Sequence, residues 1–293
     1  MGANRSRRHH YVPQMLLGNF LDDEGALWVG DQKRGKCYRS NPGNVFVEKN
    51  LYTRHDWGRG TECYDHERAL ARVESDAKPA LSSLILQVRE GRNPQLCPDL
   101  NRKFKQFLVA LARRTPESQA RIFGEPDRPF NEAFDRVAKD RFREAGREVP
   151  DQDWFDRDPA VLRVKRNAKA NLSAGFAAGE HENLQQETEK FVRETGWGVA
   201  RICLPEWSFV IGSHGLTIMA EGSRMGGSWL PIAHDVAIWV TAFPSRGCKR
   251  CLDHSNERMI KAINSATAAQ SDMIAGRSED LVRCLTMQRN RPA

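Results

Sequence analysis

The 293-residue sequence has no apolar run long enough to cross a membrane and no recognisable secretory signal. A membrane-spanning helix needs about 20 mostly apolar residues. The apolar segment that follows the basic residues 1–8 is short and interrupted by polar side chains. The seven cysteines form an odd, scattered set. We therefore expect a cytoplasmic protein with free thiols and no membrane partner.

Two widespread catalytic motifs are also missing. The glycine-rich stretch over residues 222–227 lacks the Lys-Ser or Lys-Thr pair that completes a phosphate-binding loop. No serine stands in the glycine-flanked turn that exposes a nucleophile in many hydrolases. The sequence therefore indicates neither class of enzyme, and it names no cofactor.

Charge is present in both signs, with a moderate basic excess. The 45 Lys and Arg residues outnumber 38 Asp and Glu residues, which gives a formal net charge of +7. A basic protein attracts acidic partners, of which nucleic acid is the commonest. We therefore expect nucleic acid or another anionic ligand as the partner, and the sequence does not fix the oligomeric state.

The hydrophobic pattern predicts an α+β fold. Strand-like and helical stretches segregate along the chain instead of alternating, which argues against a doubly wound sheet. We expect a single compact domain over residues 1–293, with a less regular insertion at about 124–195. Its predicted parts are an N-terminal β-hairpin (26–39), a central helical layer (62–91 and 99–114), a C-terminal antiparallel sheet (197–203, 207–211, 215–219, 228–232 and 236–243) and a final helix that closes it (256–275).

The two central helices carry charged residues beside their apolar faces. In the first helix, Glu67 and Glu74 project only about 40–60° from the centre of the apolar stripe, at the border of the buried face. In the second, Arg113 points away from the stripe, whereas Arg114 lies on its flank. The pattern therefore predicts a buried partner for Arg114.

Polar side chains are also concentrated near the N-terminus. His9, His10, Tyr11 and Gln14 fall within six residues, and an apolar segment follows at 15–20. Polar groups beside a packed element are either satisfied internally or offered to a ligand. This stretch therefore predicts the edge of a pocket.

The same stretch carries a family resemblance. His-Tyr-Val-Pro-Gln at 10–14, Leu-Gly-Asn-Phe at 17–20 and Leu-Trp-Val at 27–29 resemble the opening of a bacterial domain family of unknown function. Its members continue with a Tyr-Thr segment, a helix with two glutamates seven residues apart and an Arg-Thr-Pro segment. The matching residues here are Tyr52-Thr53, Glu67 with Glu74, and Arg114-Thr115-Pro116. The resemblance covers most of the chain and is weakest over residues 124–195. It implies a fold more than an activity.

The chain departs from the family pattern at one turn. Where the family has Ser-Asp-Asn-Pro, the chain has Ser213 or His214 in place of the aspartate. An activity that depended on that acid in the relatives would be altered or lost here.

These observations converge on one candidate site with two interpretations. Carboxylates at a hydrophobic border have raised pKa values, as a general base needs, unless they are paired. Paired with Arg114 they would form a structural ion network instead. One hypothesis is a protein that binds an anionic ligand or nucleic acid without catalysis; the other is a metal-dependent nuclease-like or other hydrolase effector in which Arg114 holds an anionic group. The candidate catalytic residues are His10, Glu67, Glu74 and Arg114, and the candidate ligand-binding residues are His9, Tyr11, Gln14, Tyr52, Ser213 and His214.

Metal binding is indicated only weakly. The His-His start is similar to that of some metal-dependent nucleases, but the further ligands, for which His55 and His66 are candidates, do not have the expected spacing. Cys248, Cys251 and His254 are three potential zinc ligands without a second Cys-x-x-Cys pair, so surface thiols are the simpler interpretation. The basic residues within 159–179 are likewise interpreted as a solvated helix face rather than a phosphate site.

Overall fold

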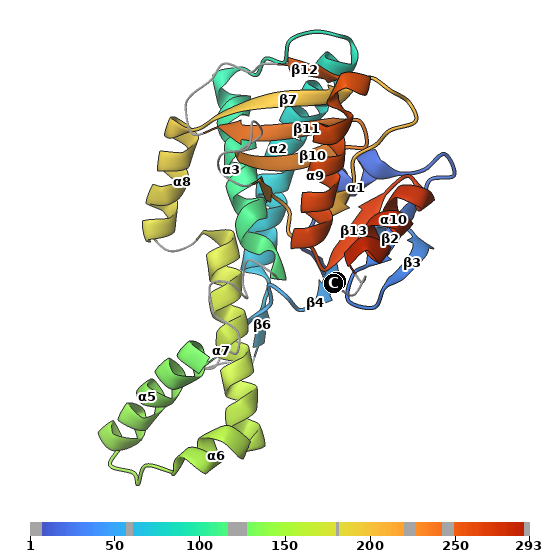
Figure 1. The fold of residues 1–293 in the computed structure, drawn as a ribbon. Helices are drawn as coiled ribbons and strands as arrows, with labels where there is room; N and C mark the ends of the chain where they lie inside the picture. Colours follow the sequence, from blue (N-terminus) through green and yellow to red (C-terminus); the bar gives the residue numbers. More distant parts are fainter. Residues whose placement is uncertain are drawn as a thin grey trace, which may run out of the picture.

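The computed structural model describes residues 8–56, 61–116, 128–179, 182–219, 227–241 and 249–289. These residues form two β-sheets with helices packed against them (Figure 1). The larger sheet has the order β12 (Lys249–Leu252), β7 (Gly196–Ile202), β11 (Val236–Thr241), β10 (Gly227–Ala233) and β9 (Thr217–Met219). The smaller sheet has the order β3 (Lys36–Ser40), β2 (Leu27–Asp31), β13 (Met273–Gly276) and β8 (Ile211–Gly212). Two ribbons pair β1 (Arg8–His10) with β4 (Val47–Lys49), and β5 (Arg54–Asp56) with β6 (Thr61–Cys63). The α+β class is confirmed.

The predicted central helical layer consists of α2 (Asp65–Arg89) and α3 (Pro98–Arg114), which lie behind the larger sheet in Figure 1. Its predicted apolar stripe on α2 is largely buried: Leu70, Ala77, Leu81, Leu84 and Val88. None of the helices in the described residues is long and apolar enough to cross a membrane. The other α-helices described are α1 (Gln14–Leu17), α5 (Arg128–Glu144), α6 (Gln152–Arg157), α7 (Pro159–Ala178), α8 (Glu182–Glu194), α9 (Glu257–Gln270) and α10 (Glu279–Arg289).

The predicted N-terminal hairpin is completed by a strand from the other end of the chain. One edge of β2 pairs with β3, and the other pairs with β13, where Ala275 lies opposite Val29. The predicted helix over 256–275 is therefore wrong at its end, because α9 stops at Gln270 and Ile274 lies in β13. A short apolar run fits a buried strand as well as a buried helical turn. Pairing with β2 and β8 decides between them here.

The helix α10 follows β13 and was not expected from the sequence. It packs against β2 at Gly30, where an added Cβ would lie 2.1 Å from Thr286 Oγ1. The absence of a side chain on Gly30 therefore lets α10 approach the strand closely. This contact covers the smaller sheet with a helix from the C-terminal end.

The C-terminal sheet is mixed instead of purely antiparallel. The strands β7, β11, β10 and β9 pair antiparallel as predicted, but β12 lies parallel to β7. The predicted strand over 207–211 is wrong for 207–210. There the Asn264 side chain accepts from the Val210 N–H (3.1 Å) and donates to the Ser208 carbonyl (2.9 Å). A buried amide of α9 takes the place of a neighbouring strand.

The predicted insertion is helical where it is described, and α5, α6 and α7 project from the rest of the molecule in Figure 1. Asp158 caps α7 by accepting from the N–H groups of Ala160 and Val161. The expected solvated face of α7 is wrong for Lys165, whose Nζ lies 2.7 Å from Asp135 Oδ1 with both side chains 8% exposed. A buried charge needs a partner, and this ion pair joins α7 to α5.

The expectation of free thiols fails for two cysteines. Cys203, after β7, forms a disulfide with Cys251 of β12. Three described cysteines, at 37, 97 and 284, are free as expected. The disulfide lies beside the parallel β7–β12 pairing and fixes an edge strand to its neighbour covalently.

Reduction of this disulfide should destabilise the protein. The bond closes a segment of 48 residues, for which the chain-entropy account gives about 4 kcal/mol. We expect dithiothreitol to lower the melting temperature by about 5–10 °C. The variant Cys203→Ser should melt at the lower temperature with or without reductant. An unchanged melting temperature after reduction, with the new thiols verified by titration, would contradict the expectation.

Candidate functional site

Four segments that are far apart in the sequence meet at one group of polar side chains. The ribbon strand β1 contributes His9 and His10, and the loop after β4 contributes Tyr52. The helix α2 contributes Glu67 and Glu74, and α3 contributes its last residue, Arg114. We call these six residues the His9–Arg114 cluster. The expected crossing of the N-terminal segment with the two central helices is present, since Arg114 contacts both β1 and α2.

Arg114 is the buried centre of this cluster, as its place on the flank of the apolar stripe predicted. Its Nη1 donates to Glu74 Oε1, and its Nη2 donates to the backbone carbonyl of His10. The guanidinium also lies 5.7 Å from the centre of the Tyr52 ring. Both terminal nitrogens therefore have internal partners. Glu74 and Arg114 form the ion pair of the structural interpretation, not an unpaired general base.

Tyr52 and His9 continue the packing around the guanidinium. The Tyr52 hydroxyl donates to the backbone carbonyl of Arg114 (2.6 Å), and the Tyr52 N–H donates to His9 Nδ1 (2.9 Å). The two rings are stacked with centroids 5.7 Å apart. Burial raises the pKa of Tyr52, so its phenol stays protonated as a donor. Because His9 Nδ1 accepts, the proton of the neutral imidazole is on Nε2.

Glu67 differs from Glu74 although both lie on the same side of α2. Its Oε2 is buried and accepts no hydrogen bond from the described residues. The nearest imidazole nitrogen is His9 Nδ1 at 4.0 Å, which already accepts from Tyr52 and has no proton to give. Burial raises the pKa of the Glu67 carboxyl; Arg114 lowers it, and Glu74 raises it further. The side chain is 35% exposed, so solvent reaches part of Glu67 although Oε2 itself is buried.

The remaining N-terminal candidates lie in different surroundings. His10 Nε2 is 2.6 Å from Gln14 Nε2, and burial lowers the pKa of His10. These two residues are therefore close together, and the pocket edge at this stretch stays a prediction. Tyr11 packs against Phe46 with ring centroids 5.8 Å apart and is buried. Its place is in the core, which gives its ligand-binding role no support.

Ser213 and His214 form a turn at the C-terminal end of α3. The buried Ser213 hydroxyl accepts from the N–H groups of Asp272 and Met273. His214 Nδ1 lies 2.8 Å from the backbone carbonyl of Leu216. An added Cβ on Gly215 would lie 3.5 Å from Thr115 Cγ2, so the turn borders the residue that follows Arg114. Ser213 has a structural task here: it holds the turn to the start of β13.

The candidate metal ligands do not come together in the described residues, where no three His, Cys, Asp or Glu side chains form a group suited to a metal ion. Cys251 is in the disulfide with Cys203 and cannot supply a thiolate while that bond is intact. Cys248 and the His55 side chain lie outside what the structure describes. His254 packs edge-on against Trp207, and His66 is buried in α2.

The sequence analysis missed two acceptor groups in the loop that carries Tyr52. Thr53 Oγ1 and Asn50 Oδ1 are buried and have no hydrogen-bond partner among the described residues. Asn50 has a φ of 59°, in the left-handed region that asparagine tolerates better than most residues. The Tyr-Thr pair of the family resemblance was a signal for Thr53. Together with Glu67 Oε2, these oxygens are places where a ligand or water can donate hydrogen bonds.

A family model confirms the resemblance that the N-terminal motif suggested. The model described as "Protein of unknown function (DUF4238)" matches residues 8–196, which is more than half of the chain. The chain belongs to the DUF4238 family. The DUF4238 match includes all six residues of the His9–Arg114 cluster and the segment 124–195 that had looked least recognisable, and it ends at the start of β7. Comparisons with curated proteins and with solved structures found no match.

Loss of the Glu74 charge should destabilise the protein. The variant Glu74→Gln leaves the buried Arg114 guanidinium without its carboxylate. Breaking a buried pair costs about 3–5 kcal/mol; Glu74 is 25% exposed, so we expect about 2 kcal/mol. Urea denaturation at neutral pH measures this loss. A free energy of unfolding equal to that of the wild type would show that the ion pair is not structural.

The matched variant Glu67→Gln should have the opposite effect. Because the folded-state pKa of Glu67 is raised, its protonated form favours folding, and that contribution is lost as the pH rises through the folded pKa. A neutral glutamine avoids the cost of a buried charge. We expect Glu67→Gln to melt a few degrees above the wild type at pH 7, with a difference that shrinks toward about pH 4. A variant less stable than the wild type at pH 7 would identify Glu67 as scaffold.

Proposed function

We propose that this DUF4238 protein binds nucleic acid, and that Glu67 accepts hydrogen bonds from the amino edge of a base. The observation that carries the proposal is the Glu67 oxygen, which is buried on a partly exposed side chain and has no donor among the described residues. A carboxylate in this state accepts from a donor group of a ligand, such as the N4 amino group of cytosine. The net charge of +7 supports an anionic partner.

The anionic part of the ligand needs a cation other than Arg114, which already donates to Glu74 and to His10. The β1–β4 ribbon offers one in Lys49, which lies opposite Arg8 in its register. The Arg8 guanidinium already donates to the Gly43 carbonyl (3.3 Å) and to Asn44 Oδ1 (2.9 Å). Lys49 is exposed and forms no ion pair with the described residues. We assign phosphate contact to Lys49.

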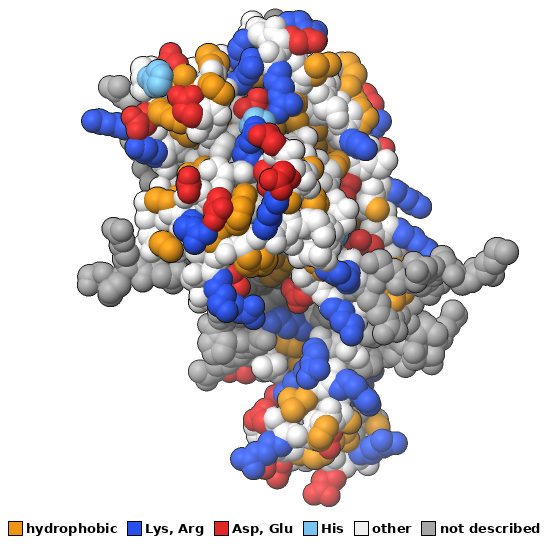
Figure 2. All heavy atoms as spheres, turned by 90° about the vertical axis from the view of Figure 1, so that its right-hand side faces the viewer, with side chains coloured by type: hydrophobic (Ala, Val, Ile, Leu, Met, Phe, Trp, Pro, Cys, Tyr) orange, Lys and Arg blue, Asp and Glu red, His pale blue; other side chains and the backbone are white. Residues whose placement is uncertain are grey.

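The visible surface is consistent with local contacts of this kind. On the face in Figure 2, basic and acidic side chains are interspersed over the upper part of the molecule. A protein that held a long duplex by charge alone would present a continuous basic stripe. The proposal concerns a short segment of nucleic acid with one base at Glu67.

Binding of fluorescent single-stranded oligonucleotides tests the proposal. The wild type should bind oligo-dC about tenfold more tightly than oligo-dT, since one good base contact discriminates by about 1–3 kcal/mol. Glu67→Gln should remove most of this preference while it keeps the salt dependence. Lys49→Ala should reduce the slope of log affinity against log salt by about 0.7 for both oligonucleotides. Fluorescence anisotropy at several salt concentrations gives both quantities.

The control variant is Lys36→Ala, which removes an exposed lysine from the other hairpin, on β3. It should change neither the slope nor the base preference. No binding at micromolar protein, equal affinity for the two oligonucleotides, or the same slope change in Lys36→Ala and Lys49→Ala would each overturn the proposal.

Hydrolysis is the second candidate function, and one observation favours it. Burial raises the pKa of the Glu67 carboxyl on a partly exposed side chain, as a general acid or base needs. The same oligonucleotides, incubated with and without Mg²⁺ or Mn²⁺, would report this activity as shortened products. Such cleavage should be lost in Glu67→Gln.

A further inference from the structure

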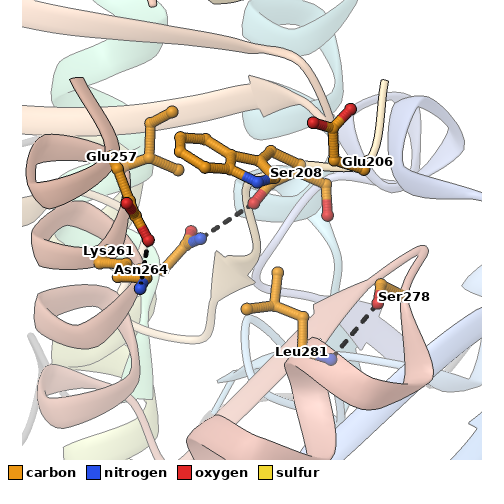
Figure 3. A pocket seen from close by; sticks show the side chains of 9 residues that line it. Glu206, Ser208, Glu257, Lys261, Asn264, Ser278 and Leu281 are labelled. Carbon is orange, nitrogen blue, oxygen red and sulfur yellow. Dashed lines mark hydrogen bonds and ion pairs between the residues drawn. The ribbon is translucent and has the colours of Figure 1, made fainter. Parts of the chain in front are cut away.

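A cavity lies apart from the His9–Arg114 cluster and is lined by residues from the C-terminal part of the chain. It has a volume of about 290 Å³ and is enclosed by the loop at 206–208, by α9 and by the start of α10 (Figure 3). This volume is near the lower end of the range for small-molecule sites in proteins. The residues that line the cavity lie outside the family match, which ends at residue 196.

The walls of this cavity are held in place by specific contacts. Asn264 fixes the loop by its hydrogen bonds to Ser208 and Val210, and Figure 3 shows it reaching across from α9. The Trp207 ring packs edge-on against His254 at 5.7 Å between centroids. Ser278 Oγ accepts from the Leu281 N–H and so caps α10. A cavity bounded by such contacts is preorganised and needs little ordering to accept a ligand.

The lining combines an apolar interior with an acidic rim. Trp207, Ile260 and Leu281 supply the apolar surface. Lys261 is 2.5 Å from Glu257 and is neutralised by it. Glu206, on the other side of the cavity in Figure 3, is exposed and forms no ion pair with the described residues. The rim therefore has one uncompensated negative charge beside an aromatic ring.

We propose that this cavity binds a small organic cation with a planar, apolar body. The body would pack against Trp207, Ile260 and Leu281, and the positive group would face the Glu206 carboxylate. Aromatic faces and carboxylates both attract cations. The negative charge of Glu206 would repel an anion. The site is separate from the proposed nucleic-acid site and does not depend on it.

Isothermal titration of the full chain with benzamidine and with benzamide tests this proposal. The two compounds have nearly the same shape, but only benzamidine is cationic at neutral pH. We expect benzamidine to bind with a dissociation constant in the millimolar range and benzamide to bind at least threefold more weakly. Glu206→Gln should bring the two affinities together, and Trp207→Leu should weaken both.

The matched control is Glu90→Gln, which removes the charge of another exposed glutamate, one paired with Arg92. It should leave both affinities unchanged, and a melting curve for each variant verifies folding. The proposal is overturned by equal binding of benzamidine and benzamide to the wild type, by the absence of saturable binding at millimolar ligand, or by an unchanged preference in Glu206→Gln.

Discussion

The structure depends on the buried guanidinium of Arg114. A buried charge is tolerated only with a paired opposite charge and hydrogen bonds; the two terminal nitrogens of Arg114 donate to Glu74 on α2 and to the backbone of β1, and its Nε has no partner among the described residues. The end of α3 is joined in this way to a helix and to a strand that are remote in the sequence. Tyr52 adds a fourth segment through the Arg114 backbone carbonyl. The N-terminal motif is thus placed by one side chain about a hundred residues away.

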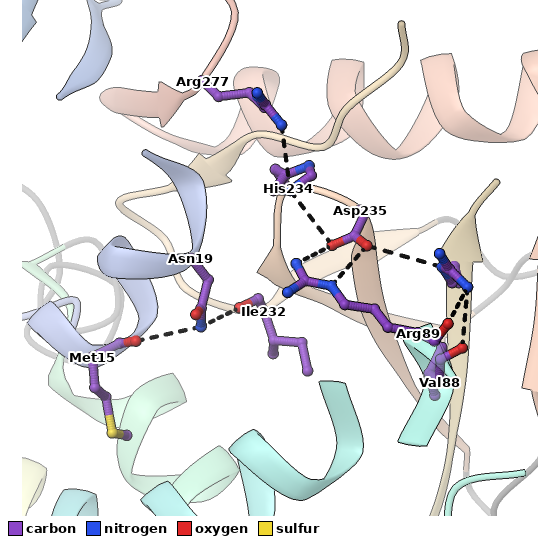
Figure 4. A network of polar contacts seen from close by, with 9 residues as sticks. Met15, Asn19, Val88, Arg89, Ile232, His234, Asp235 and Arg277 are labelled. Atoms are coloured by element: carbon purple, nitrogen blue, oxygen red, sulfur yellow. Dashed lines mark hydrogen bonds and ion pairs between the residues drawn. The ribbon is translucent and has the colours of Figure 1, made fainter. Parts of the chain in front are cut away.

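A second polar network joins the C-terminal end of α2 to the larger sheet (Figure 4). Arg89 donates to both oxygens of Asp235 in the turn between β10 and β11, at 3.0 and 2.6 Å. The Arg201 guanidinium of β7 donates to the Arg89 carbonyl at 2.7 Å. At the same sheet, Asn19 donates to the Ile232 carbonyl at 2.9 Å. The helix is therefore anchored to the larger sheet near its C-terminus and, at Glu74, to Arg114 of α3, which also contacts β1.

The sequence predicted those parts of the fold and site that local periodicity controls. Helical periodicity alone places Glu67 and Glu74 at the border of the buried face and Arg114 on the flank of the apolar stripe. The N-terminal hairpin likewise depends only on two adjacent strands and their turn. The strand β13, the parallel β12 and the Asn264 contacts depend on residues that are distant in the sequence. The hydrophobic pattern of one segment carries no information on which distant segment will pair with it. For the same reason, local patterns could not predict the disulfide between Cys203 and Cys251 or the ion pair between Lys165 and Asp135.

The contrast between Glu67 and Glu74 shows why residue type and spacing cannot assign a role. The two carboxylates are seven residues apart on one face of α2, and both were candidate catalytic groups. Glu74 meets a guanidinium and becomes part of the scaffold, whereas Glu67 meets a histidine nitrogen that already accepts a hydrogen bond. The Tyr52 N–H occupies that nitrogen, so His9 Nδ1 gives Glu67 no hydrogen bond. Burial without a donor makes the ionised form of Glu67 costly, whereas Glu74 has the Arg114 guanidinium as its partner.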